Sequence, residues 1–401
     1  MDLAQIDALT GWLIDGCLDG RSGEAMMSGV SERLVNAGFH LKRAYAGMQI
    51  LHPTLGGEGF VWRRGEGASR DTFLRNRSDG DESAWQRSPF MVLYDRGWEE
   101  GRWRLNGSPD PDRPGLLDDM AADGTTDYIA FRSRVGGVVR DGQDDVAIYT
   151  SWTVDNEAGF SNAQLSALKT LAPRIAHSLQ ATSQVRNLTN LLSTYLGRDP
   201  AERVLRGAIA QGHADMIKAV IWFSDLRGYT KLSDTMPPDQ VIPLLNDYGD
   251  AIVSAIHEFD GQVLKFIGDG VLAIFPLDGR NDAAAGALAA AKKAMADVRQ
   301  LNDRRSEADL PVTEPYIGLT VGEVFYGNIG ARERLDFTVV GPAVNEASRI
   351  AAMSRSLERQ LVVSQSFSEC IDVTDDLVSL GRYMLRGIAR PIELLTVVDG
   401  A

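Results

Sequence analysis

Cysteine is scarce in this sequence: the 401 residues include two, Cys17 and Cys370, which lie far apart in the chain. A framework of disulfides is therefore excluded, and the composition fits a reducing compartment, so we expect a cytoplasmic protein. Long apolar runs are missing too, because no uncharged apolar stretch approaches the roughly 20 residues that cross a bilayer. The first residues lack a basic segment followed by an apolar core, so we expect no signal peptide and no membrane insertion.

Basic charge is also in short supply, and the formal net charge is −14. Such a balance excludes general nucleic-acid binding, which needs a basic surface, and adhesion to anionic membranes. A polyanionic substrate would have to be held by a metal ion and a few placed cations. The hydrophobic fraction of 44% and the charged fraction of 24% are those of a globular protein, and the length predicts two or three domains.

The N-terminal part, residues 1–183, has the pattern of an α+β domain. Two helical patterns come first and four strand-like runs follow. Among these runs lies a region dense in Gly, Asp, Arg and Pro, which we expect to be rich in loops. The expected helices are Ile6–Leu18 and Ser22–Ala37, the strands are Tyr45–Leu51, Gly59–Trp62, Tyr128–Arg132 and Val146–Val154, and the loop region is Arg64–Gly124.

The segment Thr150–Phe160 and the long helical pattern after it resemble the end of a GAF domain. The resemblance rests on this short stretch and on the order of the elements. It implies a GAF-like regulatory or sensor domain at residues 1–183, with a ligand or partner protein that the sequence does not identify.

A helical linker is expected at residues 184–212. Val185, Leu188, Leu192 and Tyr195 are spaced by three, four and three residues, which is the rhythm of a coiled-coil seam. Pro173 lies upstream and is expected to kink or interrupt the helix. Two interpretations stay open: the four side chains pack on the preceding domain, or they form a parallel stalk between two copies of the chain.

Residues 213–401 alternate strand and helix patterns, which predicts a two-layer α/β sandwich. The expected elements are strand Ala219–Phe223, helix Pro238–Phe259, hairpin Gly261–Pro276, helix Asn281–Asn302, strands Tyr316–Val321, Val324–Ile329 and Phe337–Val340, helix Ala343–Ser354, and strands Leu361–Val363 and Leu394–Val398.

Two aspartates follow apolar, β-branched runs in this part of the chain: Asp225 after Ala219–Phe223 and Asp269 after Val263–Ile267. If the two strands lie side by side, both carboxylates reach one point, and converging carboxylates bind Mg²⁺ with a nucleoside triphosphate. Taken alone, Asp225 could cap a helix and Asp269 could belong to an ordinary hairpin turn.

Two further patterns suit a phosphorylated substrate. A turn from strand to helix can offer backbone N–H groups to phosphates, and its residues are Leu226, Arg227, Gly228, Tyr229 and Thr230. Asn345 and Arg349 are four residues apart on the expected helix Ala343–Ser354, so they share a face. An exposed arginine and a helix-start asparagine would be the alternative for this pair.

The ordered motifs resemble a class III nucleotidyl cyclase catalytic domain. They are Phe223-x-Asp-x-x-Gly-Tyr-Thr230, Lys265-x-x-Gly-Asp-Gly270 and Gly341-x-x-x-Asn-x-x-x-Arg349, and the match covers about 190 residues. The resemblance implies a ferredoxin-like, palm-type fold. It also implies that Asp225, Asp269 and the backbone carbonyl of Leu226 hold two Mg²⁺ or Mn²⁺ ions per active site.

The same resemblance assigns roles to further residues. Lys265 and Thr338 match the positions that read the purine, Asn345 would orient the ribose, and Arg349 would stabilise the α-phosphate. Arg386 falls near a position that holds the terminal phosphates, although a surface arginine is the alternative. Membrane-bound animal cyclases carry Asp where this chain has Thr338, whereas guanine-specific members tend to carry Glu and Cys at the two purine positions. We therefore expect ATP as the substrate.

In this family each active site lies between two catalytic domains arranged head to tail. This chain carries both sets of residues, so a homodimer with two equivalent sites is expected. The implied reaction converts ATP to 3′,5′-cyclic AMP and pyrophosphate, under control of the N-terminal domain. A guanylate cyclase and a catalytically silent nucleotide-binding module are the alternatives.

Overall fold

The computed structural model describes residues 1–74, 85–107, 113–136, 146–277, 282–371 and 377–398. It divides into two compact units, Met1–Leu191 and Leu192–Ala401, and each is described by itself. Among the described residues no helix is both long and apolar enough to cross a membrane.

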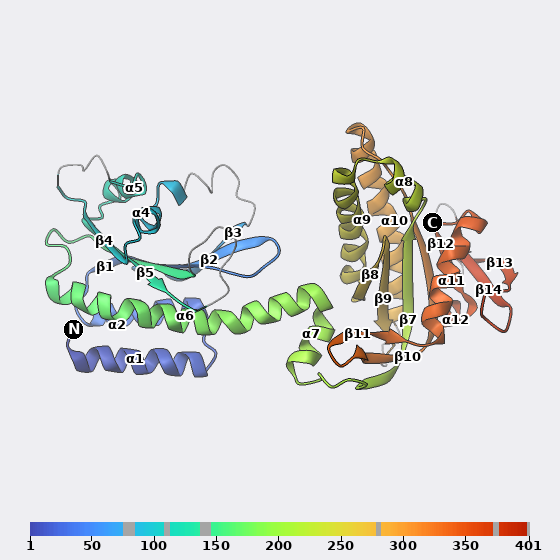
Figure 1. Cartoon of the computed structure of the whole chain (residues 1–401), viewed down its shortest axis with the longest axis horizontal. Coiled ribbons are helices and arrows are strands. Elements are labelled where there is room, and N and C mark those ends of the chain that lie inside the picture. The colour runs from blue at the N-terminus through green and yellow to red at the C-terminus, as the bar shows by residue number, and fades with distance from the viewer. Residues whose placement is uncertain (75–84, 108–112, 137–145, 278–281, 372–376, 399–401) are drawn as a thin grey trace. The chain divides into compact units, whose positions relative to one another are not determined.

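The N-terminal unit is built on a six-stranded antiparallel sheet with strand order β3-β2-β1-β6-β5-β4. Helices α1, α2 and α6 lie on one side of this sheet, and the short helices α4 and α5 lie on the other (Figure 1). The bounds are α1 Leu3–Leu18, α2 Gly23–Asn36, β1 Leu41–Gln49, β2 Leu55–Arg63, β3 Gly67–Leu74, α4 Pro89–Asp95, β4 Glu100–Arg104, α5 Leu116–Ala122, β5 Asp127–Arg134, β6 Ala147–Val154 and α6 Asn162–Leu196.

The region Arg64–Gly124, which the sequence predicts to be rich in loops, contains four short elements that the sequence analysis did not find, namely β3, α4, β4 and α5. Strand β3 pairs with β2 along its length, but its side chains are exposed, so no alternation of apolar and polar residues marks it. Helix α4 is only seven residues long and starts at Ser88, whose hydroxyl accepts a hydrogen bond from the N–H of Phe90 at 3.1 Å. Residues 75–84 and 108–112 of this region lie outside the described residues.

Helix α6 is continuous through Pro173, so of the two expected effects, a kink or an interruption, the interruption does not occur. The neighbours Leu171, Ala172 and Ile175 are buried in the core, and their packing outweighs the backbone hydrogen bond that proline cannot make. Farther along the helix, side chains of the expected coiled-coil seam are exposed to solvent: Val185 is 69% exposed and Leu188 is 51% exposed. These side chains therefore do not pack on the N-terminal unit.

The C-terminal unit contains an eight-stranded sheet with the order β13-β14-β12-β10-β7-β9-β8, and β11 pairs with β10. The expected strands Tyr316–Val321 and Val324–Ile329 form one strand, β10, because Gly322 and Glu323 stay in register with β7. The bounds are α7 Arg198–Leu205, β7 Ala214–Leu226, α8 Tyr229–Thr235, α9 Pro238–Glu258, β8 Gln262–Ile267, β9 Gly270–Pro276, α10 Ala283–Glu307, β10 Pro315–Ala331, β11 Arg334–Val340, α11 Pro342–Leu357, β12 Leu361–Ser364, α12 Gln365–Ser368, β13 Leu377–Tyr383 and β14 Ile392–Val397.

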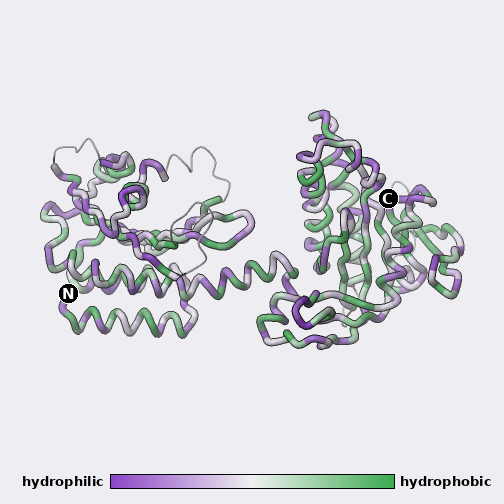
Figure 2. The backbone as a smooth tube through the Cα atoms, viewed as in Figure 1, coloured by the Kyte–Doolittle hydropathy of each residue, from purple (hydrophilic) through white to green (hydrophobic). Residues whose placement is uncertain are grey.

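The two faces of this sheet are covered differently. Helices α9 and α10 pack on one face over Trp222 and Phe275, whereas α11 packs on the other, with Ile221 beneath it in a second core (Figure 1). The central strands are largely hydrophobic, as Figure 2 shows, because both faces bury side chains. Helix α11 approaches β10 so closely that a Cβ at Gly318 would lie 2.5 Å from the backbone nitrogen of Ala351. Glycine at this position fixes the helix that carries Asn345 and Arg349.

Candidate active site

The structure brings Asp225 and Asp269 together. Asp225 lies one residue before the end of β7, and Asp269 is at the tip of the β8–β9 hairpin, which pairs with β7 through Val271 and Ser224. The backbone N–H of Leu226 donates to Asp225 Oδ1 and to Asp269 Oδ2, at 3.1 Å in both cases. Two carboxylates that are 44 residues apart in the sequence therefore accept hydrogen bonds from the same N–H group.

Glycine lets the hairpin tip come this close. Gly268 has a φ of +64°, which a residue with a side chain rarely adopts. A Cβ at Gly270 would lie 2.5 Å from the carbonyl oxygen of Ser224, so any side chain there would push the hairpin away from β7. The Gly-Asp-Gly sequence is thus required by the turn and by the contact with the neighbouring strand.

The electrostatics of the pair follow from this proximity. Burial raises the pKa of Asp225 to about 7, and the hydrogen bond and negative charge of Asp269 act in the same direction. The Leu226 N–H and the more distant charge of Arg355 on α11 act against this rise in pKa. A proton between the two carboxylates thus relieves their repulsion, and a divalent cation would do so with more charge.

The donor set suits a hard cation that binds oxygen. Among the described residues, no group of three or more His, Cys, Asp or Glu side chains could hold a metal ion. A cation at Asp225 and Asp269 would therefore complete its coordination with backbone carbonyl, water or substrate oxygens, as at sites that bind metal together with a phosphorylated substrate. The residues present fit Mg²⁺ or Mn²⁺.

The expected phosphate turn offers fewer backbone N–H groups than the sequence pattern predicts. The N–H of Leu226 is taken by the carboxylates, and the N–H of Arg227 donates to the carbonyl of Glu314 at 2.8 Å. The Arg227 side chain also pairs with Glu314, at 2.9 Å. Gly228, with a φ of +67°, leads into α8, and the first N–H groups of a helix have no partner within it. The backbone donors that suit phosphate are those of residues 228–230.

Lys265 on β8 and Thr338 on β11 are connected through Asp336, which is also on β11. Lys265 Nζ is 3.4 Å from Asp336 Oδ2, and Asp336 is on the same face of β11 as Thr338 because the two are separated by one residue. Thr338 is 4% exposed, and within the described part of the chain its hydroxyl has no hydrogen-bond partner. A buried hydroxyl without a partner is costly, which suits a group that waits for a ligand. Sequence analysis missed Asp336, although the spacing Asp-x-Thr on one strand was available as a signal.

Asn345 and Arg349 are both exposed on α11. A groove of about 570 Å³ runs past the start of this helix. Its lining includes Val340, Pro342 and Asn345 on one side and Gly387, Ile388 and Ala389 on the other. The loop that carries Arg386 therefore lies beside the start of α11, and the Arg386 side chain is exposed.

The expected site residues form two groups in one chain. Asp225 and Asp269 meet at the end of β7. Thr338 is on β11, Asn345 and Arg349 are on α11, and Lys265 on β8 contacts Asp336 of β11. Among the described residues, no hydrogen bond or ion pair joins the carboxylate pair to Lys265, Thr338, Asn345 or Arg349.

Residues 213–397 match the family model of the adenylate and guanylate cyclase catalytic domain. This stretch is a class III nucleotidyl cyclase domain. It has the palm-type arrangement of α and β elements expected from the sequence, but the expectation of two layers is wrong, because helices pack on both faces of the sheet. The GAF resemblance of the N-terminal unit stays a prediction.

Several proteins are similar to part of this chain. The uncharacterized protein Rv1319c of Mycobacterium tuberculosis is 31% identical over 237 residues, which cover 59% of this chain and 42% of the relative. The chain thus spans less than half the length of the curated relatives that it matches. Two solved structures also resemble it. The adenylyl cyclase CyaB from P. aeruginosa is 26% identical, covers 47% of this chain and 97% of its own, and has a TM-score of 0.44. The guanylyl cyclase Cya2 is 28% identical, covers 47% and 96%, and has a TM-score of 0.41.

Proposed function

We propose that the cyclase domain is an adenylate cyclase that converts ATP to 3′,5′-cyclic AMP and pyrophosphate. The observation that carries this proposal is the convergence of Asp225 and Asp269 on the N–H of Leu226 within a domain of this family. The choice of adenine rests on Lys265 and on the unpartnered hydroxyl of Thr338. A lysine ammonium donates to the N1 acceptor of adenine, and a threonine hydroxyl accepts from its 6-amino group.

Asp225, Asp269 and the carbonyl of Leu226 would hold two Mg²⁺ or Mn²⁺ ions. Bound there, divalent cations would lower the pKa of the ribose 3′-hydroxyl and offset the charge of the departing pyrophosphate. Residues of the chain itself would bind and position the substrate. The N–H groups of residues 228–230 and the Arg386 side chain would hold the terminal phosphates, which places the α-phosphorus opposite the 3′-oxygen.

In this scheme the bond from the 3′-oxygen to the α-phosphorus forms as the bond from the α-phosphorus to pyrophosphate breaks. The 3′-hydroxyl proton would pass to water or to the substrate phosphates, since none of the assigned site residues is an obvious general base. Asn345 would orient the ribose, and Arg349 would stabilise the negative charge that grows on the α-phosphate oxygens. Their exposure on α11 leaves both side chains free to reach a nucleotide.

We propose further that the active form is a head-to-tail homodimer. The two groups of site residues are not joined within a chain, so one copy would supply the carboxylate pair and the other the residues on β8, β11 and α11. The exposed seam at Val185 and Leu188 supports pairing through the linker. The N-terminal unit would then regulate the pair through α6, which extends from its core.

Assays of the purified full chain test this proposal directly. Conversion of ATP with Mg²⁺ or Mn²⁺ is followed by chromatography of the products, with GTP in a parallel reaction. We expect cyclic AMP from the wild type and a loss of more than 100-fold in Asp225→Asn, a variant that keeps the size of the side chain. Asp250→Asn, which makes the same change at an exposed position on α9, serves as the matched control. Preferred turnover of GTP would favour the guanylate cyclase alternative, and nucleotide binding without turnover would favour the silent module.

A further inference from the structure

The backbone that follows the carboxylate pair is held by the residues just before β10. The N–H of Arg227 donates to the carbonyl oxygen of Glu314 at 2.8 Å, and the carbonyl oxygen of Arg227 accepts from the hydroxyl of Thr313 at 2.7 Å. Both backbone polar groups of Arg227 therefore face the segment before β10. Because the Arg227 side chain is exposed, these bonds rather than its burial fix the backbone at this point.

The planarity of the peptide unit extends the effect of these two bonds to the neighbouring residues. In a trans peptide unit the C=O group and the following N–H group point in opposite directions, and the described residues contain no cis peptide bond. The bond from Arg227 to Glu314 therefore turns the carbonyl of Leu226 away from β10, to the side on which the Leu226 N–H meets the carboxylate pair. The bond from Thr313 likewise turns the N–H of Gly228 away from β10. Within the described residues this N–H has no hydrogen-bond partner.

Thr313 is itself held by two helices. It is 7% exposed, its N–H donates to the hydroxyl oxygen of Tyr248 on α9, and its carbonyl oxygen accepts from Nδ2 of Asn302 on α10, at 2.8 Å in both cases. The Tyr248 hydroxyl donates in turn to Oδ1 of Asn302. Burial raises the pKa of Tyr248, so the phenol stays protonated and acts as donor and acceptor at once. The hydroxyl that holds Arg227 is thus fixed relative to α9 and α10.

A buried arginine anchors the same segment farther upstream. Arg305 on α10 is 4% exposed, forms an ion pair with Asp247 on α9, and donates from Nε to the carbonyl oxygen of Pro311 at 2.8 Å. Connections between a helix and a strand are usually among the more mobile parts of a domain. Residues 308–314 differ, because polar contacts with two helices hold them on the side that faces Arg227.

We propose that Thr313 is a positioning residue of the nucleotide site. Its hydroxyl holds the peptide unit between Arg227 and Gly228, so that the Gly228 N–H is directed at the terminal phosphates of a nucleotide bound at the carboxylate pair. This role rests on the proposed function, since it explains how donors of the proposed site are aimed. A charged phosphate oxygen accepts such a hydrogen bond strongly, and a donor that is fixed before binding loses little freedom when the ligand arrives.

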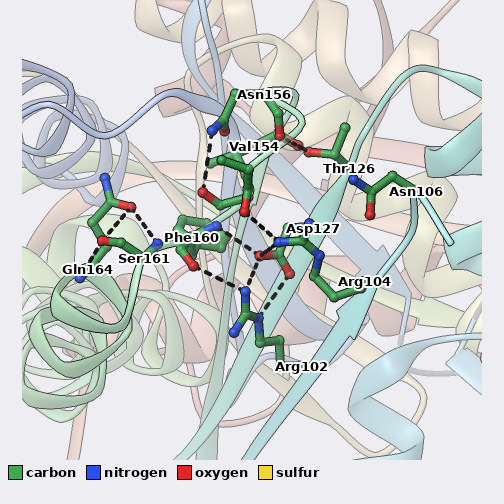
Figure 3. Close-up of polar contacts among 12 residues, drawn as sticks. Arg102, Arg104, Asn106, Thr126, Asp127, Val154, Asn156, Phe160, Ser161 and Gln164 are labelled. Atoms are coloured by element: carbon green, nitrogen blue, oxygen red, sulfur yellow. Dashed lines mark hydrogen bonds and ion pairs between the residues drawn. The ribbon is translucent and has the colours of Figure 1, made fainter.

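A threonine hydroxyl can also hold a loop for stability alone. In the N-terminal unit the hydroxyl of Thr126 donates to the carbonyl oxygens of Val154 and Asn156, at 3.1 and 2.6 Å, among the polar contacts that Figure 3 shows. These contacts fix the loop before α6 and belong to a different unit from the nucleotide site. A purely structural hydroxyl is therefore the competing explanation for Thr313.

Titrations of the purified full chain separate the two explanations without turnover. Thr313→Val keeps the shape of the side chain and removes the hydroxyl. We expect Mn²⁺ alone to bind this variant within about twofold of the wild-type affinity, because Asp225 and Asp269 are unchanged. Pyrophosphate, titrated in saturating Mn²⁺, should bind about five- to tenfold more weakly, and the KM for ATP should rise by a similar factor with a smaller change in kcat. Thr313→Ser keeps a hydroxyl and should restore both quantities.

Thr396→Val is the matched control. The Thr396 hydroxyl is also buried and donates to a carbonyl oxygen, that of Leu361, at 2.7 Å, on a strand that β12 and β10 separate from β7. This variant should lose stability but bind pyrophosphate as the wild type does. If Thr313→Val does not fold, Tyr248→Phe takes its place, since it removes only the hydroxyl that holds Thr313, and it should weaken pyrophosphate binding in the same direction.

The results that would overturn the proposal differ from those that concern the reaction. Unchanged pyrophosphate binding in Thr313→Val, equal weakening of Mn²⁺ and pyrophosphate binding, or no pyrophosphate binding by the wild type would show that Thr313 does not position phosphate donors. A wild type that binds pyrophosphate, with the expected loss in Thr313→Val, but forms no cyclic nucleotide would overturn the proposed function and support the role of Thr313.

Discussion

The ammonium nitrogen of Lys265 lies 3.4 Å from a carboxylate oxygen of Asp336, and this contact connects β8 with β11 across 71 residues of sequence. Both side chains are more than one third exposed, so the ion pair contributes little to folding stability. The contact instead fixes the direction of the Lys265 side chain, toward the strand that carries Thr338.

Asp336→Asn should therefore raise the KM for ATP by up to about fivefold, the equivalent of roughly 1 kcal/mol, with little change in kcat. The unfolding free energy should stay within about 0.5 kcal/mol of the wild type. Steady-state kinetics and urea unfolding measure the two quantities. Glu333→Gln, an exposed acid on the same hairpin, is the control, and an unchanged KM in Asp336→Asn would contradict this role.

The unpartnered hydroxyl of Thr338 allows a sharper test. Thr338→Val removes a buried polar atom that has no partner, so the free chain should be as stable as the wild type or more stable, by up to about 1–3 kcal/mol. The preference for ATP over GTP should fall, because the acceptor for the 6-amino group is gone.

Thr320 is the matched control for this substitution. It is equally buried, but its hydroxyl contacts Glu346 at 2.6 Å and Ser364 at 2.8 Å. Thr320→Val should destabilise the chain by about 1–3 kcal/mol and leave the nucleotide preference unchanged. Destabilisation by Thr338→Val with unchanged preference would instead show a structural hydroxyl.

The carboxylate pair predicts how stability depends on pH without metal. The folded chain raises the pKa of Asp225 to about 7, so the protonated form contributes stability that is complete below the ordinary pKa of about 4 and is lost as the pH rises through about 7. In EDTA the unfolding temperature of the wild type should fall across this window, and the fall should be much smaller in Asp225→Asn. Mn²⁺ should bind more tightly above pH 7 than below it, since it competes with the shared proton. Calorimetric titrations on each side of pH 7 measure this, and an affinity independent of pH would contradict it.

Shared active sites predict complementation between inactive variants. Asp225→Asn lacks one half of the site and Arg349→Ala lacks the other, so each alone should be inactive. In a mixed dimer one site combines both defects and the other has none. Mixing equal amounts should restore roughly a quarter of the wild-type rate, since about half of the dimers are mixed and each keeps one of two sites. Sites contained within single chains would give no recovery.

The exposed seam on α6 predicts that activity depends on protein concentration. Leu188→Asp places a charge in the middle of the proposed stalk, so the specific activity should fall at low concentration and recover at high concentration. Asn187→Asp adds the same charge one position away, outside the seam, and should have little effect. Sedimentation velocity gives the oligomeric state of both variants, and identical behaviour of the two would count against the stalk.

The meeting of Asp225 and Asp269 could be anticipated from the sequence because apolar runs mark strands and the aspartates mark their ends. The approach of Asp336 to Lys265 could not, since it depends on how the β10–β11 hairpin lies against β8. Pro173 shows the same limit in a helix: a local rule predicts a break, but the buried side chains on either side decide the outcome. The use of the Arg227 N–H by Glu314 likewise depends on a strand that begins almost 90 residues later.

Helix α6 contains 35 residues and is therefore about 52 Å long. Its buried residues extend as far as Ser183, and the remaining stretch to Leu196 is about as long as the shortest helices that persist in water. The buried part acts as the nucleus, so the exposed part only has to propagate the helix. The balance between helix and coil in those last turns is thus close to even, and small changes at either end of the segment would be enough to order or melt it.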